Sequence, residues 1–436
     1  MVAIYSDIKS ERLQFVLELV FDEILKCGHE VYHHRDAFIA CDLPKVVYGR
    51  EAMDDDVLII PDSGLLGEKG IRQQSFDTVQ WKSFNMLFPS KVASAVFPFD
   101  PFSMIFYLVS RYEEYLADSM KDRHGRFQAK NSILSRLNML NRPIVDILAK
   151  EIKTRIGERY PAYKFPPVNY SFQPSYDIDM AFAHLGKSFL RTIGGFARLF
   201  MKLQAREIRG RVKTLLGLEQ DPFDNFDLQE ELHRDLGLKP LYFVNLGDYS
   251  RFDKNVSYRS KRLQDLLVKL SSRSELGIHP SYYSDVDFDV LKKEKERLEE
   301  ITGKPVKKSR QHFLKMEFPG TYRKLIRLGI EDDHSMGYAS QTGYRAGISS
   351  PFYFYDLKEE KKTLLRIHPF AFMDTVFLDY LGARPAEIPG MAEPLLTEAK
   401  ELEIPLAAIW HNYALADDKE RIDAYKSILN KAVEIK

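Results

Sequence analysis

Short apolar runs and amphipathic patterns alternate along the second part of the chain. Apolar runs that predict strands cover 241–246, 276–279, 306–312, 328–332, 348–355, 364–370 and 404–410. Apolar positions three or four residues apart predict helices over 228–236, 260–271, 288–302, 319–328 and 419–432. Alternation of strand and helix indicates an α/β fold with a parallel sheet, and this number of units favours a distorted (β/α) barrel of seven or eight strands.

The first part of the chain has the pattern of a smaller α/β domain. Strands are expected at 2–5, 30–33 and 57–61, and helical structure at 12–27 and 100–115. The stretch 158–167 contains three prolines, which cannot continue a helix, so we expect a linker there. The sequence thus predicts an N-terminal domain of unknown role at 1–165 and a barrel domain at 168–436, each with its own core.

A basic insertion at 186–220 interrupts the barrel pattern. Residues 186–217 contain eight Lys or Arg residues and one acid, Glu207. Between them, apolar residues recur at helical spacing: Phe189, Ile193, Phe196, Phe200 and Leu203. Two interpretations stay open. The segment is either a surface helix that covers part of the barrel, with a solvated basic face, or a peripheral contact with an anionic glycan or membrane surface through 187–213.

Composition excludes several classes of protein. With 44% hydrophobic residues and a formal net charge of zero, the chain fits a folded soluble protein and not one that binds nucleic acid through its overall charge. Cys27 and Cys41 are too few for a disulfide framework and lack zinc-knuckle spacing. The sequence starts directly on a predicted strand and has no apolar run of about 18 residues. A cytoplasmic protein without a membrane span is therefore expected.

Two acids follow the apolar approach to the first barrel strand. Asp177 and Asp179 are two residues apart, so on a strand their side chains would point to the same face. Carboxylates at one place repel each other unless a metal, an arginine or a shared proton offsets the repulsion. Taken alone, the pair is explained equally well as an acidic turn in which one acid caps the next helix.

Further polar residues lie where later strands are expected to end. They are His279, Arg310, His312, Asp332, Asp333, His368 and His411. A single histidine at such a position is more often structural than functional. The C-terminal ends of barrel strands meet at one mouth, however, and several histidines and acids gathered there suit a divalent metal such as zinc.

Four segments in this order resemble the motifs of polysaccharide deacetylases of carbohydrate esterase family 4. They are Ser175-Tyr176-Asp177-Ile178-Asp179, Glu275-Leu276-Gly277-Ile278-His279-Pro280-Ser281-Tyr282-Tyr283-Ser284, Ser309-Arg310-Gln311-His312-Phe313 and Ile409-Trp410-His411-Asn412. The resemblance covers about residues 168–436. The whole chain resembles a bacterial group in which an uncharacterised α/β domain precedes such a module, and Tyr344-Arg345-Ala346-Gly347 and Asp374 resemble further features of that group.

The resemblance implies a role for each matched residue. Asp177 corresponds to the catalytic base, Arg310 to the arginine that orients it, and His411 to the acid. Asp179 corresponds to a metal ligand, and His279 to the first of two metal-binding histidines.

The sequence departs from the family pattern at the second histidine, where it has Tyr283. A phenol titrates near pH ~10 and is a poor ligand in its protonated form. The leading replacement is His312, which stands where the family has a proline, and His368 is the reserve candidate. If neither completes the site, the metal is weakly bound or absent.

These correspondences imply a metal-dependent hydrolase, with zinc the expected ion. It would cleave the C–N bond of N-acetyl groups on a polysaccharide or glycoconjugate sugar. The alternative is a non-catalytic glycan-binding or assembly module that kept the mouth of the barrel after losing part of the metal site.

Overall fold

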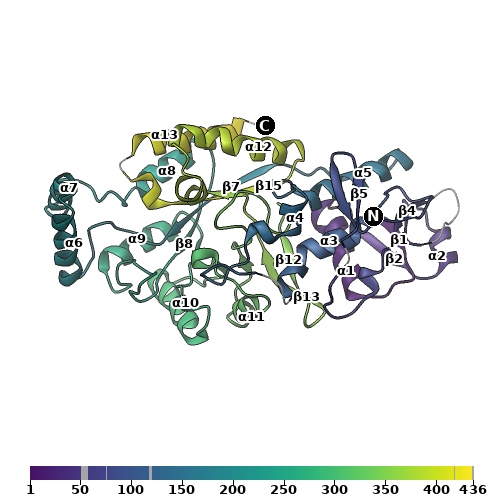
Figure 1. The fold of residues 1–436 in the computed structure, drawn as a ribbon, viewed down its shortest axis with the longest axis horizontal. Coiled ribbons are helices and arrows are strands. Elements are labelled where there is room, and N and C mark those ends of the chain that lie inside the picture. Colours follow the sequence, from purple (N-terminus) through teal and green to yellow (C-terminus); the bar gives the residue numbers. More distant parts are fainter. Residues whose placement is uncertain (51–56, 75, 117–119, 417, 435–436) are drawn as a thin grey trace.

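The computed structural model describes residues 1–50, 57–74, 76–116, 120–416 and 418–434. The molecule is elongated (Figure 1). Its N-terminal part lies at one end, and helices α6 (Phe189–Met201) and α7 (Ala205–Leu215) lie at the other.

The N-terminal part is built on a four-stranded parallel sheet in the order β2-β1-β3-β4. Its strands are β1 (Val2–Tyr5), β2 (His29–Tyr32), β3 (Lys45–Gly49) and β4 (Leu58–Pro61), and β5 (Thr78–Trp81) and β6 (Phe84–Leu87) form a separate antiparallel pair. The helices are α1 (Glu11–Leu17), α2 (Arg35–Ala40), α3 (Pro101–Val109), α4 (Ile133–Arg136) and α5 (Ile144–Arg159). The expected strands at 2–5, 30–33 and 57–61 are confirmed to within one residue at each end.

Local chemistry explains where two of these helices begin. The Ser10 side chain accepts a hydrogen bond from the backbone N–H of Leu13 at the start of α1. Asp100 does the same for Ser103 at the start of α3, where Pro101 occupies a first-turn position that needs no N–H. The helix expected over 12–27 is present as α1 followed by a π-helical segment, Glu18–Ile24.

The second part contains a nine-stranded sheet in the order β12-β13-β11-β10-β9-β8-β7-β15-β14. Its strands are β7 (Ser171–Ile178), β8 (Leu241–Val244), β9 (Leu276–Ile278), β10 (Lys308–Ser309), β11 (Asp332–Asp333), β12 (Phe352–Asp356), β13 (Lys361–Ile367), β14 (Phe372–Met373) and β15 (Pro405–His411). All neighbours pair in parallel except β12 and β13, which are antiparallel. The remaining helices are α8 (Phe226–Asp235), α9 (Lys261–Ser271), α10 (Phe288–Thr302), α11 (Gly320–Arg327), α12 (Ile388–Glu401) and α13 (Lys419–Glu434).

The sheet is parallel as expected, but it does not close into the expected barrel. Among the described residues no ladder joins β14 to the β12 and β13 edge. The four residues 368–371 connect β13 to β14. Their backbone N–H groups donate to carbonyls of other segments, from His368 to Asp333, from Phe370 to Met336 and from Ala371 to Ala407, and Pro369 has no N–H. The edge strands β12 and β14 therefore stay unpaired with each other among the described residues.

The expectation that the two parts have separate cores is wrong. One contiguous cluster of buried apolar side chains contains residues of both, from Val2 to Ala432. Tyr355 of β12, for example, packs against Phe15 and Phe106 with ring centroids 5.0 and 5.1 Å apart. The predicted domain boundary at 165–168 stays a prediction.

A buried charge network also joins the two parts. Arg345 donates two hydrogen bonds to Glu114, at 2.9 and 2.6 Å, and Arg111 donates to the same carboxylate at 2.9 Å. Burial raises the pKa of Glu114, but the attraction of Arg345 and Arg111 exceeds this effect and leaves the pKa below its usual value. The network thus holds an ionised carboxylate between two buried guanidinium groups.

We expect Glu114→Gln to lower the free energy of unfolding by about 3–5 kcal/mol, because it leaves Arg345 buried without a carboxylate partner. Urea denaturation followed by circular dichroism would measure the loss. The matched control is Asp265→Asn, which removes an exposed pair with Lys261 and is expected to cost about 0–1 kcal/mol. Equal losses in the two variants would contradict a stabilising role for the buried network.

No helix in the described part of the chain combines the length and the apolar character needed to cross a bilayer.

Candidate active site

The parallel ladder of the large sheet brings the polar residues together at the C-terminal ends of its strands. Asp177, near the end of β7, lies opposite His411 of β15 on one side and Phe243 of β8 on the other. Ser309 of β10 lies opposite Ile278 of β9, so His279 and Arg310 are the first residues beyond these two strands. Because the strands are parallel, all these residues lie at the same end of the sheet, as the sequence predicts.

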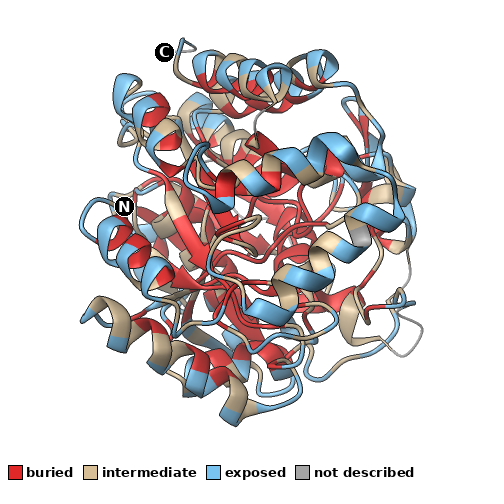
Figure 2. Cartoon of the chain, turned by 90° about the vertical axis from the view of Figure 1, so that its left-hand side faces the viewer, coloured by how far each residue is buried: buried red, intermediate tan, exposed pale blue. Residues whose placement is uncertain are grey.

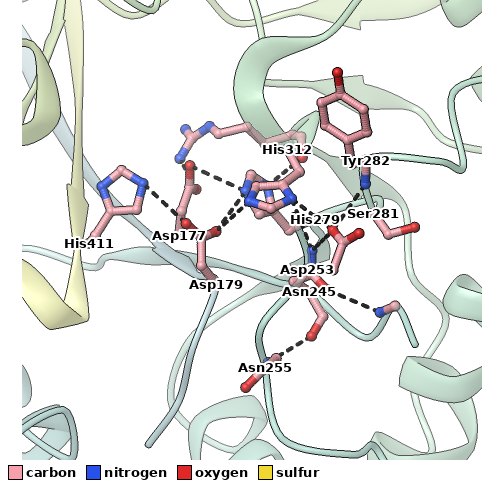
Figure 3. Close-up of polar contacts among 12 residues, drawn as sticks. Asp177, Asp179, Asn245, Asp253, Asn255, His279, Ser281, Tyr282, His312 and His411 are labelled. Atoms are coloured by element: carbon pink, nitrogen blue, oxygen red, sulfur yellow. Dashed lines mark hydrogen bonds and ion pairs between the residues drawn. The ribbon is translucent and has the colours of Figure 1, made fainter. Parts of the chain in front are cut away.

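Asp179, His279 and His312 form a cluster with the geometry of a metal site (Figure 3). One possible ligand atom from each lies within 4.8 Å of the other two. Nε2 of His279 is 3.1 Å from Oδ1 of Asp179, and Nε2 of His312 is 3.6 Å from the same oxygen. This oxygen is buried and accepts no hydrogen bond among the described residues.

A second contact fixes the orientation of each histidine. Nδ1 of His279 donates to the carbonyl oxygen of Arg310 at 2.6 Å, and Nδ1 of His312 donates to Oδ1 of Asp253 at 2.9 Å. Metal-binding histidines commonly hold their second ring nitrogen in this way. In the neutral rings, both Nε2 atoms are then lone-pair acceptors facing a carboxylate, an arrangement that a bound cation or proton would stabilise.

Without a metal, a proton on His312 stabilises this arrangement. Burial lowers the pKa of His312, but Asp179 and Asp253 together raise it to about 9. Burial raises the pKa of Asp179, but His312, His279 and His411 hold it well below its usual value. A metal ion would have to displace the proton from His312, so metal binding would release protons.

Asp253, which holds His312, is itself firmly held in the loop after β8. It accepts hydrogen bonds from Ser250 Oγ at 2.7 Å, from the Tyr282 backbone N–H at 3.0 Å and from Asn245 Nδ2 at 3.2 Å. The sequence pattern does not point to Asp253. No feature of the sequence separates it from Asp248 in the same loop, whose side chain is 81% exposed and pairs with Arg297.

We expect Asp253→Asn to weaken metal binding by about 10–100-fold, because loss of a partner behind a ligand usually has an effect of that size. Isothermal titration of metal-free protein with zinc would measure the change. Asp248→Asn is the control and should bind zinc like the wild type. Unchanged affinity in Asp253→Asn would show that His312 does not need this partner.

Asp177 and Arg310 form a buried ion pair beside the cluster. One terminal nitrogen of Arg310 donates to Asp177 Oδ1 at 2.8 Å, and the other donates to Ser175 Oγ at 2.8 Å. The guanidinium lies over the Phe243 ring, 4.2 Å from its centroid. The second oxygen of Asp177 is 3.8 Å from Nε2 of His279. Arg310 thus occupies one carboxylate oxygen and leaves the other facing the cluster.

His411 lies on the side of Asp179 that faces away from His279 and His312 (Figure 3). Its Nδ1 donates to Asp374 Oδ1 at 2.7 Å, and its backbone N–H donates to Asp374 Oδ2 at 2.7 Å. Its Nε2 is 3.8 Å from Asp179 Oδ2. Burial lowers the pKa of His411, but Asp374, Asp179 and Asp177 raise it to about 10. In the metal-free site His411 is therefore protonated at neutral pH.

The other polar residues expected at the strand ends lie outside the cluster. His368, the reserve ligand, contacts Asp332 at 2.6 Å and stacks on the ring of His334. Asp333 accepts a hydrogen bond from Ser309 Oγ at 2.7 Å. Tyr283 is 47% exposed. The structure thus places His312, and neither His368 nor Tyr283, beside Asp179 and His279.

His312 reaches the cluster by a different route from the expected one. On the strand expected over 306–312, Arg310 and His312 would have their side chains on one face because they are two residues apart. In the structure β10 ends at Ser309, and His312 begins a short 3₁₀ segment, His312–Leu314. A turn after the strand, and not strand alternation, therefore aims both side chains at the site.

The cluster opens into a cavity of about 200 Å³. Asp177, Asp179, His279, His312 and His411 all line it. Its wall also includes Arg126, Gln311 and three aromatic side chains, those of Phe313, Tyr380 and Tyr413. Asp177, the cluster and His411 thus face one small space.

Comparisons with known proteins give one family match and several similar solved structures. Residues 2–161 match a family of unknown function, DUF7033. No curated protein matches the sequence. Among solved structures, a protein from Mycobacterium smegmatis named as a polysaccharide deacetylase is similar, with 13% identity, a TM-score of 0.42 and coverage of 62% of this chain and 86% of that chain. The polysaccharide deacetylase from Bacillus cereus has 13% identity and a TM-score of 0.29, covering 47% of this chain and 81% of that one.

Proposed function

We propose that this protein is a metal-dependent hydrolase that removes N-acetyl groups from a polysaccharide or glycoconjugate sugar. The observation that carries the proposal is the Asp179, His279 and His312 cluster, which lies beside both the Asp177–Arg310 pair and the Asp374–His411 pair. Metal ligands, a carboxylate base and a histidine acid are groups that can together perform metal-assisted amide hydrolysis.

The residues present fit a divalent cation. Asp179 offers a buried oxygen that has no hydrogen-bond partner in the described part of the chain, and the two histidines offer Nε2 atoms whose rings are already oriented. One carboxylate and two imidazoles form a common ligand set for catalytic zinc, which usually has three protein ligands. When bound, the cation would polarise the acetyl carbonyl and lower the pKa of water.

Asp177 is placed to act as the general base. Arg310 holds one of its oxygens and stabilises the ionised carboxylate, so the other oxygen can accept a proton from the attacking water. The C–O bond to the acetyl carbon forms as this proton transfers to Asp177. Ser175 and the Phe243 ring restrain the guanidinium, which keeps the base in a fixed position.

His411 is placed to act as the general acid. Asp374 holds the proton on Nδ1, which leaves the proton on Nε2 directed toward the cavity. As the C–N bond breaks, His411 Nε2 donates this proton to the departing nitrogen. The products are acetate and a sugar with a free amine.

The glycan substrate is supported by the shape and chemistry of the cavity and by the sequence motifs. A space of about 200 Å³ with an open mouth can admit an acetamido group while the rest of a glycan stays outside. The rings of Phe313, Tyr380 and Tyr413 offer apolar surfaces against which a sugar can pack.

A second function, that of a non-catalytic glycan-binding module, is motivated by Tyr283 in place of the second histidine of the family pattern. Acetate release separates the two. Zinc-loaded protein would be assayed against N-acetylated oligosaccharides, polysaccharides and nucleotide sugars, with chelator-treated protein as the control. Release that needs the metal supports the hydrolase. Binding of a glycan without acetate release under any metal condition would support the binding module.

A further inference from the structure

Helices α6 and α7 form a hairpin at the end of the molecule farthest from the N-terminal part (Figure 1). We call residues 187–218 the basic hairpin. Figure 2 looks directly at this end, and the helices nearest the viewer are mostly exposed or half-buried, whereas the strands behind them are buried. The basic hairpin thus contributes little to the core.

The basic hairpin exposes large apolar side chains. Those of Phe189, Leu190, Phe200, Met201, Leu203, Leu216 and Leu218 are between 68% and 86% exposed. Phe189, Ile193 and Phe200 recur at helical spacing, so they share one face of α6, and all three are exposed. These three side chains therefore do not cover the sheet. Apolar surface gathered on one exposed element marks a contact site.

The same segment is strongly basic. Residues 187–218 contain eight cationic residues and one acid, although the whole chain has 63 of each sign. Among the described residues, Lys202, Arg206 and Arg209 have no carboxylate partner within ion-pair distance, whereas Lys213 pairs with Glu219. A cavity of about 1200 Å³ lies between the hairpin and the body. Seven cations of the hairpin line it, together with Lys254 and the acids Glu207 and Glu219: Lys187, Arg191, Lys202, Arg206, Arg209, Arg211 and Lys213.

Two of the cations near this cavity, Lys187 and Arg211, are not fully stabilised by their neighbours. Arg211 is buried against the Phe196 ring, and its Nε has no hydrogen-bond partner among the described residues. Burial, together with Arg191 and Arg211, lowers the pKa of Lys187 to about 8. Anionic groups entering this space would stabilise the charged form of these side chains.

We propose that the basic hairpin binds the protein peripherally to an anionic membrane surface. Its exposed apolar side chains would enter the boundary between headgroups and acyl chains, and its cations would contact lipid phosphates. The combination of apolar and cationic groups favours lipid over an anionic glycan, because a glycan would leave the apolar side chains in water. The site would thus work close to a lipid surface without a membrane-spanning helix.

Co-sedimentation with vesicles tests the proposal on the full chain. We expect binding to vesicles that mix phosphatidylcholine with phosphatidylglycerol, and no binding to phosphatidylcholine alone. Binding to the mixed vesicles should weaken as salt is added. The triple variant Lys202→Gln, Arg206→Gln, Arg209→Gln should lower the partition coefficient by about 100-fold, which corresponds to ~1 kcal/mol for each cation near the surface.

Two matched controls isolate the hairpin. Lys26→Gln, Arg234→Gln, Lys261→Gln removes three exposed cations elsewhere and should leave most of the binding intact. Phe200→Ser with Leu203→Ser should weaken binding at least tenfold, whereas Leu364→Ser, at an 86% exposed position outside the hairpin, should not. Unchanged circular dichroism would show that each variant is folded.

Three results would overturn the proposal. One is equal binding to neutral and anionic vesicles, or binding to neither. Another is equal loss of binding in the hairpin and control triple variants. The third is a concentration-dependent dimer in light scattering that Phe200→Ser with Leu203→Ser abolishes, because a second copy of the chain would then cover the apolar face. Acetate release from soluble substrates does not enter any of these outcomes, so they are independent of the proposed activity.

Discussion

Replacement of His312 by alanine is expected to remove the metal from the site. With Asp179 and His279 alone, a divalent ion would have two protein ligands, whereas catalytic zinc sites usually have three. Because loss of a partner behind a ligand already costs about 10–100-fold in affinity, loss of the ligand itself should cost more than about 100-fold. Elemental analysis of protein purified without a histidine tag should find near-stoichiometric metal in the wild type and little in the variant.

The structure offers two matched controls for this experiment. His368→Ala removes a histidine that also follows a strand but contacts Asp332. Tyr283→Phe alters the position at which the family pattern has its second histidine. Both variants should keep the metal, while His279→Ala should lose it. A wild type that binds no divalent metal under any loading condition would contradict the hydrolase and leave the glycan-binding module as the better explanation.

Asp177→Asn should abolish most of the activity and leave the metal in place. The amide cannot accept the proton from water, and loss of a general base typically lowers the rate by about 10²–10⁴-fold. Asp177 is outside the group of three ligands, so zinc content should match the wild type. The measurement is acetate release from the best substrate, together with metal analysis of the same sample.

Two comparisons sharpen this test. His312→Ala should lose metal and activity together, whereas Asp177→Asn should lose activity alone. Ser175→Ala removes one hydrogen bond to Arg310 and should have a much smaller effect than Asp177→Asn, because the ion pair with Asp177 remains. Activity of Asp177→Asn within tenfold of the wild type would rule out its role as the base.

Much of the secondary structure was predictable, because local patterns determine it. The helix expected over 288–302 is present with the same bounds, since the Asp287 side chain caps its first turn and Gly303 ends it in a left-handed conformation. Helix α12 was not predicted. It contains Gly390 and, in its interior, Pro394, which are poor helix formers, and packing of its buried residues offsets their effect.

The site was predictable only where chain order and strand ends define it. Asp177, His279 and His411 come together because the parallel ladder aligns the ends of their strands. Asp253 was not predictable, because a loop brings it to His312 and loop geometry leaves no periodic signal in the sequence. Closure of the barrel was expected from the number of strands, but that number does not determine whether the two edge strands, β12 and β14, pair with each other.

The three residues from Arg310 to His312 have three functions in the proposed site. The Arg310 side chain holds the base, its carbonyl oxygen holds Nδ1 of His279, and His312 is a candidate ligand. Any displacement of this short turn would disturb proton transfer and metal affinity together. Substitutions at Arg310 and His312 should therefore combine non-additively. Selection would therefore act on the residues of this turn together, and replacement of one of them would require adjustment of the others.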